Sequence, residues 1–176
     1  PMFMLDEATT LSDPAKYDKA AALKFDTARP YLEFAKQTGI GLRGHTLVWH
    51  TQVPDWFFRE GYTNDGDYVD RDTMLIRMES YIRQTFELLE KGGWIESFYA
   101  YDVLNEAWID DGSMRPESMW LQTIGDDYMW HAFNFANKYA PEYIDLYYND
   151  FNEQFKTEAL YNFIQTLKDE DGNYLI

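Results

Sequence analysis

Asn105 and Glu106 are the residue pair with the clearest potential for chemistry in this sequence. They follow an apolar, β-prone run at residues 98–104 (FYAYDVL), and the chain then breaks into a polar turn at residues 110–112 (DDG). A strand that ends in an amide beside a carboxyl is typical of a scaffold that directs a reactive acid into a cleft. We therefore expect Glu106 to be catalytic, although composition alone equally allows a surface glutamate that opens a loop.

Two further apolar runs also end in polar or ring-bearing side chains. Residues 40–49 carry His45 and Trp49 and lead to Gln52, and residues 144–148 lead to the segment 149–152 (NDFN). Because the carboxyl ends of parallel strands meet at one edge of a sheet, we expect these side chains to surround one site. The alternative for His45 is a core histidine that is hydrogen-bonded to the backbone.

Hydrophobic spacing predicts the elements that position these strand ends. Helices are expected over residues 26–38, 71–91, 126–139 and 157–168, strands over 40–49, 98–106 and 144–148, and loops over 9–14 and 51–70. In the longer loop, the aromatic cluster at residues 56–58 (WFF) favours packing over a ligand wall. The regular alternation of helix and strand indicates a parallel sheet, so the predicted fold class is α/β.

Three strands cannot close a barrel, because a (β/α)8 TIM barrel typically needs about 250 residues. We expect the whole chain, residues 1–176, to supply about three central βα units of such a barrel, which the chain alone does not close. The start at Pro1 rather than Met, and an end at Leu175 and Ile176 that resembles a fourth strand, fit a segment of a longer domain. Uncovered sheet edges predict self-association unless the remaining strands are supplied.

The charge of the chain disfavours several classes of partner. A net charge of −16 and a pI near 4.4 argue against nucleic acid and anionic membranes, because the chain has no basic patch to release counterions. The sequence holds no cysteine and no uncharged run of transmembrane length. The segment 110–112 (DDG) resembles a cation loop, but turn chemistry explains it better, so we expect no metal and no cofactor.

Three longer motifs carry a specific resemblance. Residues 44–57 (GHTLVWHTQVPDWF), 102–107 (DVLNEA) and 147–152 (YYNDFN) closely resemble glycoside hydrolase family 10, the endo-1,4-β-xylanases. The resemblance covers nearly the whole chain and corresponds to the middle of that family's barrel, from just after its second strand to just before its sixth.

The resemblance implies roles for the residues at the strand ends. Glu106 would be the general acid/base, and Asn105 would hydrogen-bond the 2-hydroxyl of the sugar at the cleavage point. Four further residues would line sugar subsites: His45, Trp49, Gln52 and Asn152. His50 matches a position with a mainly structural role.

Two positions depart from the family pattern. Phe151 stands where the family usually has Tyr, which removes a hydroxyl and any hydrogen bond from that position. Tyr101 stands where Trp is frequent, a change that we expect to be tolerated.

Retaining glycoside cleavage needs two carboxyl groups about 5 to 5.5 Å apart, one of which keeps its proton in apolar surroundings. We expect Trp49 and Trp108 to surround the Glu106 carboxyl. In the family the nucleophilic Glu lies at the end of the seventh strand, which this chain does not contain. We therefore expect the isolated chain to have no meaningful xylanase activity.

Two hypotheses of different class follow. The first is a segment of a retaining endo-xylanase that acts on xylan or xylo-oligosaccharides once the same or a second polypeptide supplies the remaining barrel strands. The second is a non-catalytic fragment or a decayed relative that at most binds xylan. Another retaining β-glycosidase on the same barrel is a weaker alternative. The resemblance also implies a secreted or extracellular protein.

Overall fold

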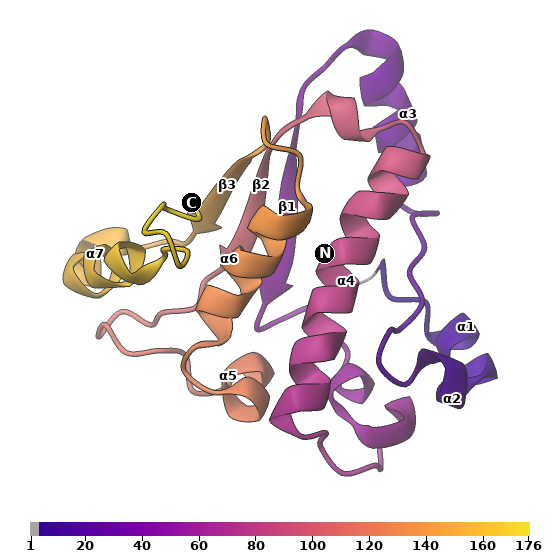
Figure 1. Cartoon of the computed structure of the whole chain (residues 1–176), viewed down its shortest axis with the longest axis horizontal. Helices are drawn as coiled ribbons and strands as arrows, with labels where there is room; N and C mark the ends of the chain where they lie inside the picture. Colours follow the sequence, from indigo (N-terminus) through magenta and orange to yellow (C-terminus); the bar gives the residue numbers. More distant parts are fainter. Residues whose placement is uncertain (1–3) are drawn as a thin grey trace.

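The computed structural model describes residues 4–176 and contains one parallel sheet. Its strands lie in the order β1-β2-β3, and both neighbouring pairs are parallel (Figure 1). The strands are β1 (Leu42–Trp49), β2 (Phe98–Asn105) and β3 (Asp145–Asn149). This arrangement confirms the predicted α/β class and the predicted crossover connections.

Four longer helices connect or follow the strands. They are α3 (Arg29–Thr38), α4 (Arg71–Lys91), α6 (Tyr128–Tyr139) and α7 (Thr157–Thr166), all close to their predicted ranges. The sequence explains where they begin and end: the Asp70 side chain accepts a hydrogen bond from the Thr73 N–H at the start of α4, and Gly39 ends α3 with a φ of 72°.

Three short helices were not predicted as separate elements, although the sequence indicates an irregular to helical stretch over residues 1–24. They are α1 (Glu7–Ser12), α2 (Pro14–Tyr17) and α5 (Met119–Ile124). The predicted loop at residues 9–14 is wrong except at Asp13, because α1 extends to Ser12 and α2 begins at Pro14. Asp6 caps α1 by accepting a hydrogen bond from the Thr9 N–H at 3.3 Å. Short 3-10 turns cover Asp55–Phe58, Glu60–Tyr62, Ile95–Ser97 and Glu153–Phe155.

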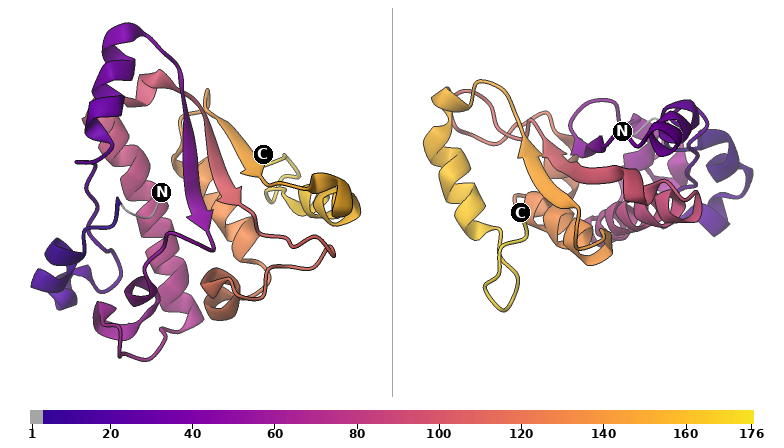
Figure 2. Two further views of the ribbon diagram at one scale, coloured as in Figure 1. Left: turned by 180° about the vertical axis from the view of Figure 1, so that it is seen from behind. Right: turned by 90° about the horizontal axis from the view of Figure 1, so that it is seen from above.

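The helices cover the sheet unevenly. Helices α4 and α6 lie against one face of the three strands, and the view from above shows the opposite face without a helix across it (Figure 2). Helix α7 lies to the side of β3 (Figures 1 and 2). The core between the sheet and α4 and α6 includes these fully buried side chains: Val48, Met78, Ile82, Val103 and Phe133.

The predicted fourth strand at the end of the chain does not form. Tyr174 instead makes an isolated antiparallel bridge with Lys168, and the Leu175 N–H donates to the Leu167 carbonyl oxygen at 3.0 Å. The buried Leu175 thereby packs as part of a short turn after α7. Both outer strands, β1 and β3, keep one edge without a neighbouring strand within residues 4–176.

The long loop between β1 and α4 is a packing unit. Trp56, Phe57 and Phe58 are all buried, and the rings of Phe57 and Phe58 lie 5.9 and 4.9 Å from the ring of the fully buried Trp120. The packing interpretation of this aromatic cluster is therefore confirmed. In the described chain, residues 4–176, no helix has the length and apolar character needed to cross a membrane.

Candidate active site

Glu106 is the first residue after β2 at the carboxyl edge of the sheet. Its half-buried side chain accepts a hydrogen bond from Trp49, the last residue of β1, with 3.1 Å between Nε1 and Oε2. The Glu106 backbone has a φ of 51°, in the left-handed region that costs a non-glycine residue about 1–2 kcal/mol. This turn directs the carboxyl toward the end of the neighbouring strand.

Left-handed backbone recurs at the other two strand ends. Gln52 follows β1 with a φ of 57°, and Asn152 follows β3 with a φ of 55°. All three residues are among those that the sequence marks as functional. Because strained non-glycine residues concentrate at functional sites, this clustering supports a site at the carboxyl edge.

Asn105 lies in one row with Trp49 and Asn149 across the sheet, as the strand register pairs these three residues. Its amide is buried, and its Oδ1 accepts from Asn149 Nδ2 at 2.7 Å. In the opposite amide orientation its oxygen lies 3.0 Å from Trp49 Nε1. The structure thus brings Trp49, Asn105 and Glu106 into direct contact.

His45 is held by a carboxylate rather than by backbone. Its Nδ1 lies 2.8 Å from Oδ2 of the buried Asp102, whose other oxygen accepts from Arg43 Nε at 2.9 Å. The bond to Asp102 raises the pKa of Arg43, which also lies over the Tyr147 ring at 4.4 Å. The His45 ring lies 6.0 Å from that of Trp49, so Asp102 fixes a half-exposed imidazole beside the indole.

His50 has a different environment from His45. It is half-buried, its ring lies edge-on to Trp49 at 5.9 Å, and its buried Nδ1 has no partner within residues 4–176. Burial, followed by the nearby Arg115 charge, lowers the pKa of His50. The imidazole is therefore neutral at neutral pH.

Gln52 and Asn152 belong to the segments that follow β1 and β3. Gln52 is exposed, and the half-buried Asn152 donates from Nδ2 to Asp110 Oδ2 at 3.1 Å. Within residues 4–176 neither side chain makes a hydrogen bond to Glu106. Both lie on loops at the carboxyl edge, and their assignment to sugar binding stays a prediction.

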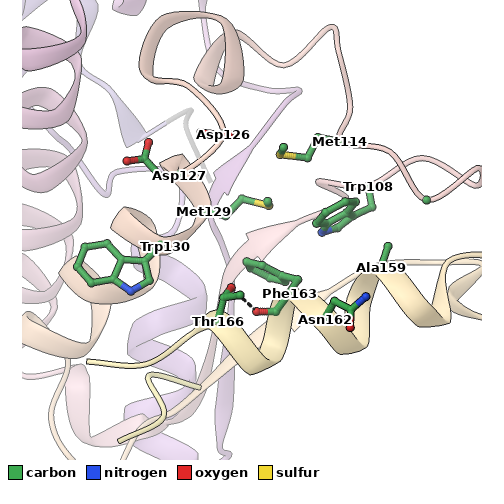
Figure 3. Close-up of a pocket in the computed structure, with 11 residues that line it drawn as sticks. Trp108, Met114, Asp126, Asp127, Met129, Trp130, Ala159, Asn162, Phe163 and Thr166 are labelled. Carbon is green, nitrogen blue, oxygen red and sulfur yellow. Dashed lines mark hydrogen bonds between the residues drawn. The ribbon is translucent and has the colours of Figure 1, made fainter. Parts of the chain in front are cut away.

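The Trp108 indole packs against helix α7. It contacts Phe163, with 6.1 Å between the ring centroids, and lines a pocket of about 630 Å³ between α6, α7 and the loop that follows β2 (Figure 3). The pocket lining is mostly apolar and includes Met114, Met129, Trp130 and Phe163. Of the two expected indoles, Trp49 donates a hydrogen bond to the carboxyl, whereas Nε1 of Trp108 has no hydrogen-bond partner within residues 4–176.

The segment 110–112 forms a turn. Asp111 Oδ1 accepts from the backbone N–H and the hydroxyl of Ser113 at 2.8 and 2.7 Å, and these bonds lower the pKa of Asp111. Such bonds are typical of an Asx turn. Within residues 4–176, no group of three or more His, Asp or Glu side chains is placed to hold a metal ion.

Four residues near the site were not assigned a function from the sequence. Asp102 and Asp150 stand inside the motifs without a role assigned to them, and Arg115 and Lys156 were not singled out. One signal was available for Lys156, since a lysine directly before a helix opposes the helix dipole and suggests an anionic partner. The partner is Asp150, at 2.8 Å.

Parallel βα units that gather an Asn-Glu pair, an indole and a histidine at the carboxyl edge of the sheet define this chain as part of a (β/α)8 barrel of the glycosidase type. The chain belongs to glycosyl hydrolase family 10, whose profile matches residues 10–172. This membership confirms the resemblance seen in the three motifs.

Named relatives extend the comparison. The chain is 46% identical over 151 residues to endo-1,4-beta-xylanase B of Butyrivibrio fibrisolvens, covering 86% of this chain and 23% of that protein. It is 44% identical over 150 residues to a putative endo-1,4-beta-xylanase of Caldicellulosiruptor saccharolyticus, covering 84% of this chain and 48% of that protein.

Solved structures show the same fold. The xylanase 10B modules of Clostridium thermocellum, crystallised with xylohexaose, match with a TM-score of 0.79 at 35% identity, over 85% of this chain and 32% of that one. An intracellular xylanase of Thermoanaerobacterium saccharolyticum matches with a TM-score of 0.76 at 35% identity, over 86% and 47%. The chain spans less than half the length of each of these four proteins.

Proposed function

We propose that this chain is the segment of a retaining endo-1,4-β-xylanase that carries the acid/base, Glu106. The observation that carries the proposal is the contact of the Glu106 carboxyl with Trp49, beside Asn105, at the carboxyl edge of a family 10 sheet. The named relatives are xylanases, and one related structure was solved with xylohexaose, which supports xylan as the substrate.

The geometry suggests how Glu106 works. Trp49 Nε1 donates to Oε2 and fixes the carboxyl, so Oε1 is the oxygen available for proton transfer. Glu106 protonates the glycosidic oxygen as the bond to the leaving sugar breaks, and then removes a proton from the attacking water.

The neighbouring side chains position the sugar. Asn105 donates to the 2-hydroxyl at the cleavage point, where hydrogen bonds strengthen in the oxocarbenium-like transition state. Trp49 offers an apolar face to a sugar ring, and His45, held by Asp102, presents its free ring nitrogen to a hydroxyl. Gln52 and Asn152 are proposed to contact sugars further along the cleft.

The second carboxyl, the nucleophile, is proposed to come from strands that this chain lacks. Those strands belong to the rest of the same polypeptide or to a second one, and they complete the barrel at the free edges of β1 and β3. The 176-residue chain alone is therefore expected to release no reducing sugar from xylan. Secretion stays a prediction, since one of the related structures is described as an intracellular xylanase.

The test uses the complete barrel and aryl xylobiosides that differ in leaving-group pKa. Glu106→Ala is expected to lower kcat/KM on xylan by about 10²–10⁴-fold. It should lower kcat/KM for an activated aryl xylobioside much less, because a good leaving group needs no proton. Azide should restore turnover of the activated substrate and give the β-xylosyl azide, which reports a retaining mechanism.

Glu158→Gln, an exposed glutamate in the first turn of α7, is the matched control and should leave all rates unchanged. An equal loss on every substrate in Glu106→Ala would contradict the acid/base role. Binding of xylohexaose by a complete barrel that turns over no substrate would instead establish a non-catalytic xylan-binding relative.

A further inference from the structure

Lys156 and Asp150 form a buried ion pair behind the loop that follows Glu106. Their side chains are 0% exposed, and Lys156 Nζ lies 2.8 Å from Asp150 Oδ1. Lys156 Nζ also donates to the Trp108 carbonyl oxygen at 2.9 Å and lies 3.8 Å from Asp110 Oδ1. The pair therefore connects the start of α7 and the end of β3 to the segment that carries Glu106.

A second arm of the same network runs through Tyr148. Its hydroxyl donates to Asp150 Oδ2, and its oxygen accepts from the Ala107 N–H at 3.2 Å. The network thus holds the backbone N–H of Ala107 and the carbonyl of Trp108, one group in each of the two residues that follow Glu106. Burial, then the bond to Asp150, raises the pKa of Tyr148, so its hydroxyl stays protonated at neutral pH.

The turn at Glu106 needs such support. Its left-handed φ of 51° is unfavourable for a glutamate and persists only where the surroundings hold it. The Glu106 N–H donates to the Asn149 carbonyl oxygen at 2.9 Å, and its own carbonyl accepts from Arg115 Nε at 2.8 Å. These bonds fix Glu106 itself, whereas the Lys156 network fixes the chain immediately after it.

Stability alone does not explain a buried ion pair at this place. Apolar residues of similar volume are often as stabilising as a buried pair, because both charges lose their hydration. Lys156 also directly precedes α7, where a positive charge opposes the helix dipole. A role in fixing geometry accounts for keeping both charges.

We propose that the Lys156–Asp150 pair is the positioning device for the Glu106 carboxyl: it holds the left-handed turn after β2 and thereby keeps the carboxyl against the Trp49 indole. Lys156 is a positioning residue and acts through the backbone of Ala107 and Trp108. The inference rests on the proposed function in that Glu106 is the proton donor whose position matters.

The first test measures hydrogen exchange and NMR resonances of the complete barrel that contains this chain. Lys156→Met removes the charge at similar volume, and the double variant Lys156→Met/Asp150→Asn removes the charge that the single variant would leave unpaired. Both should raise the hydrogen-exchange rate of the Ala107 amide at least about tenfold, since less stable local structure opens more often. In both variants the NMR chemical shift of the Trp49 indole N–H should also move toward the value that it has in the Glu106→Gln variant.

Lys138→Met, which removes a surface ion pair of Lys138 with Glu79, is the control and should change neither signal. Unchanged exchange at Ala107 together with an unchanged Trp49 resonance in the folded double variant would overturn the proposal.

The second test uses the complete barrel. The double variant should lower kcat/KM for xylo-oligosaccharides about 10–100-fold, and should lower kcat/KM for an activated aryl xylobioside much less, because kcat/KM reports the first step and a good leaving group needs no proton there. Equal losses on both substrates would indicate a general structural role and overturn the proposal. If Glu106→Ala lowers the kcat/KM of both substrates equally, the acid/base assignment is refuted. If Glu106→Ala lowers them unequally but the double variant lowers them equally, only the positioning role is refuted.

Discussion

Gly44 is the only glycine in strands β1, β2 and β3, and its substitution is predicted to be destabilising because β1 packs there directly on the Tyr101 ring. Gly44 pairs with Tyr101 in the strand register, and a Cβ at Gly44 would lie 2.3–2.5 Å from three atoms of that ring. The Gly44 backbone does not have a left-handed φ, so an alanine would be strained only by the ring. The buried Tyr101 has little room to yield, since its ring centroid lies 5.5 Å from that of Phe86 and 5.8 Å from that of Phe98.

The expected magnitude follows from the missing space. Carbon atoms in contact sit about 3.5–4.0 Å apart, so Gly44→Ala must move the ring or the strand by more than about 1 Å. Overpacking of a filled core costs about 1–3 kcal/mol, and the enclosed ring places this substitution near the upper end of that range. In the double variant Gly44→Ala/Tyr101→Leu, the loss of unfolding free energy should be smaller than the sum of the two single losses by at least about 1 kcal/mol, because the leucine removes the clashing ring.

Urea unfolding of the complete barrel that contains this chain, followed by tryptophan fluorescence, measures these free energies. Gly41→Ala is the matched control: its Cβ would lie 3.0 Å from the Tyr99 ring, but Tyr99 is 55% exposed and free to move, so the cost should stay below about 0.5 kcal/mol. A cost for Gly44→Ala no larger than that of Gly41→Ala, or additive effects in the double variant, would refute the reasoning.

Two further predictions concern charged groups. The hydrogen bond from Arg71 holds the pKa of Asp127 below its usual value, so this carboxylate adds stability that is present above about pH 4 and lost as the pH falls through the lower folded-state pKa. Urea unfolding should therefore show Asp127→Asn less stable than the parent at pH 7, and the difference should shrink as the pH falls below about 4. A difference that grows on acidification would contradict this. Arg77 is buried and donates to three backbone carbonyl oxygens, so Arg77→Met should cost about 3 kcal/mol or more. Arg83→Met, which breaks an exposed pair with Glu87, should cost less than about 1 kcal/mol in the same assay, and similar costs would show that the buried carbonyls find other partners.

The sequence predicted the larger elements because their hydrophobic spacing and end signals agree. Helix α4 spans Arg71–Lys91 as predicted, with a capping Asp70 before it and Gly92 after it. The short helices are not marked by both kinds of signal. Helix α5 has six residues and depends on Trp120, which is fully buried and donates from Nε1 to the Trp49 carbonyl oxygen at 3.0 Å. That contact spans 71 residues of sequence and leaves no local pattern.

The sequence also placed part of the site. Trp49, Asn105 and Asn149 come together because each ends a strand and the parallel register aligns the three ends in one row. The direction of a side chain after a strand is harder to predict, since it depends on the backbone conformation of that one residue. Trp108 shows this, because two residues after Glu106 its indole packs against Phe163 of α7, a contact between distant parts of the chain that the sequence alone does not indicate.

The orientation of Glu106 depends on residues far from it in sequence. Trp49 reaches its carboxyl across 57 residues, and Lys156 reaches the Trp108 carbonyl across 48. Between these two contacts lies a single left-handed residue, so a small change at either contact can rotate the carboxyl without unfolding the sheet. Because Lys156 and Asp150 follow β3, the position proposed for the Glu106 carboxyl requires β3 and the start of α7 to be folded, although Glu106 itself directly follows β2. Removing the segment after Tyr139 should therefore release the Glu106 turn even where β1 and β2 remain paired.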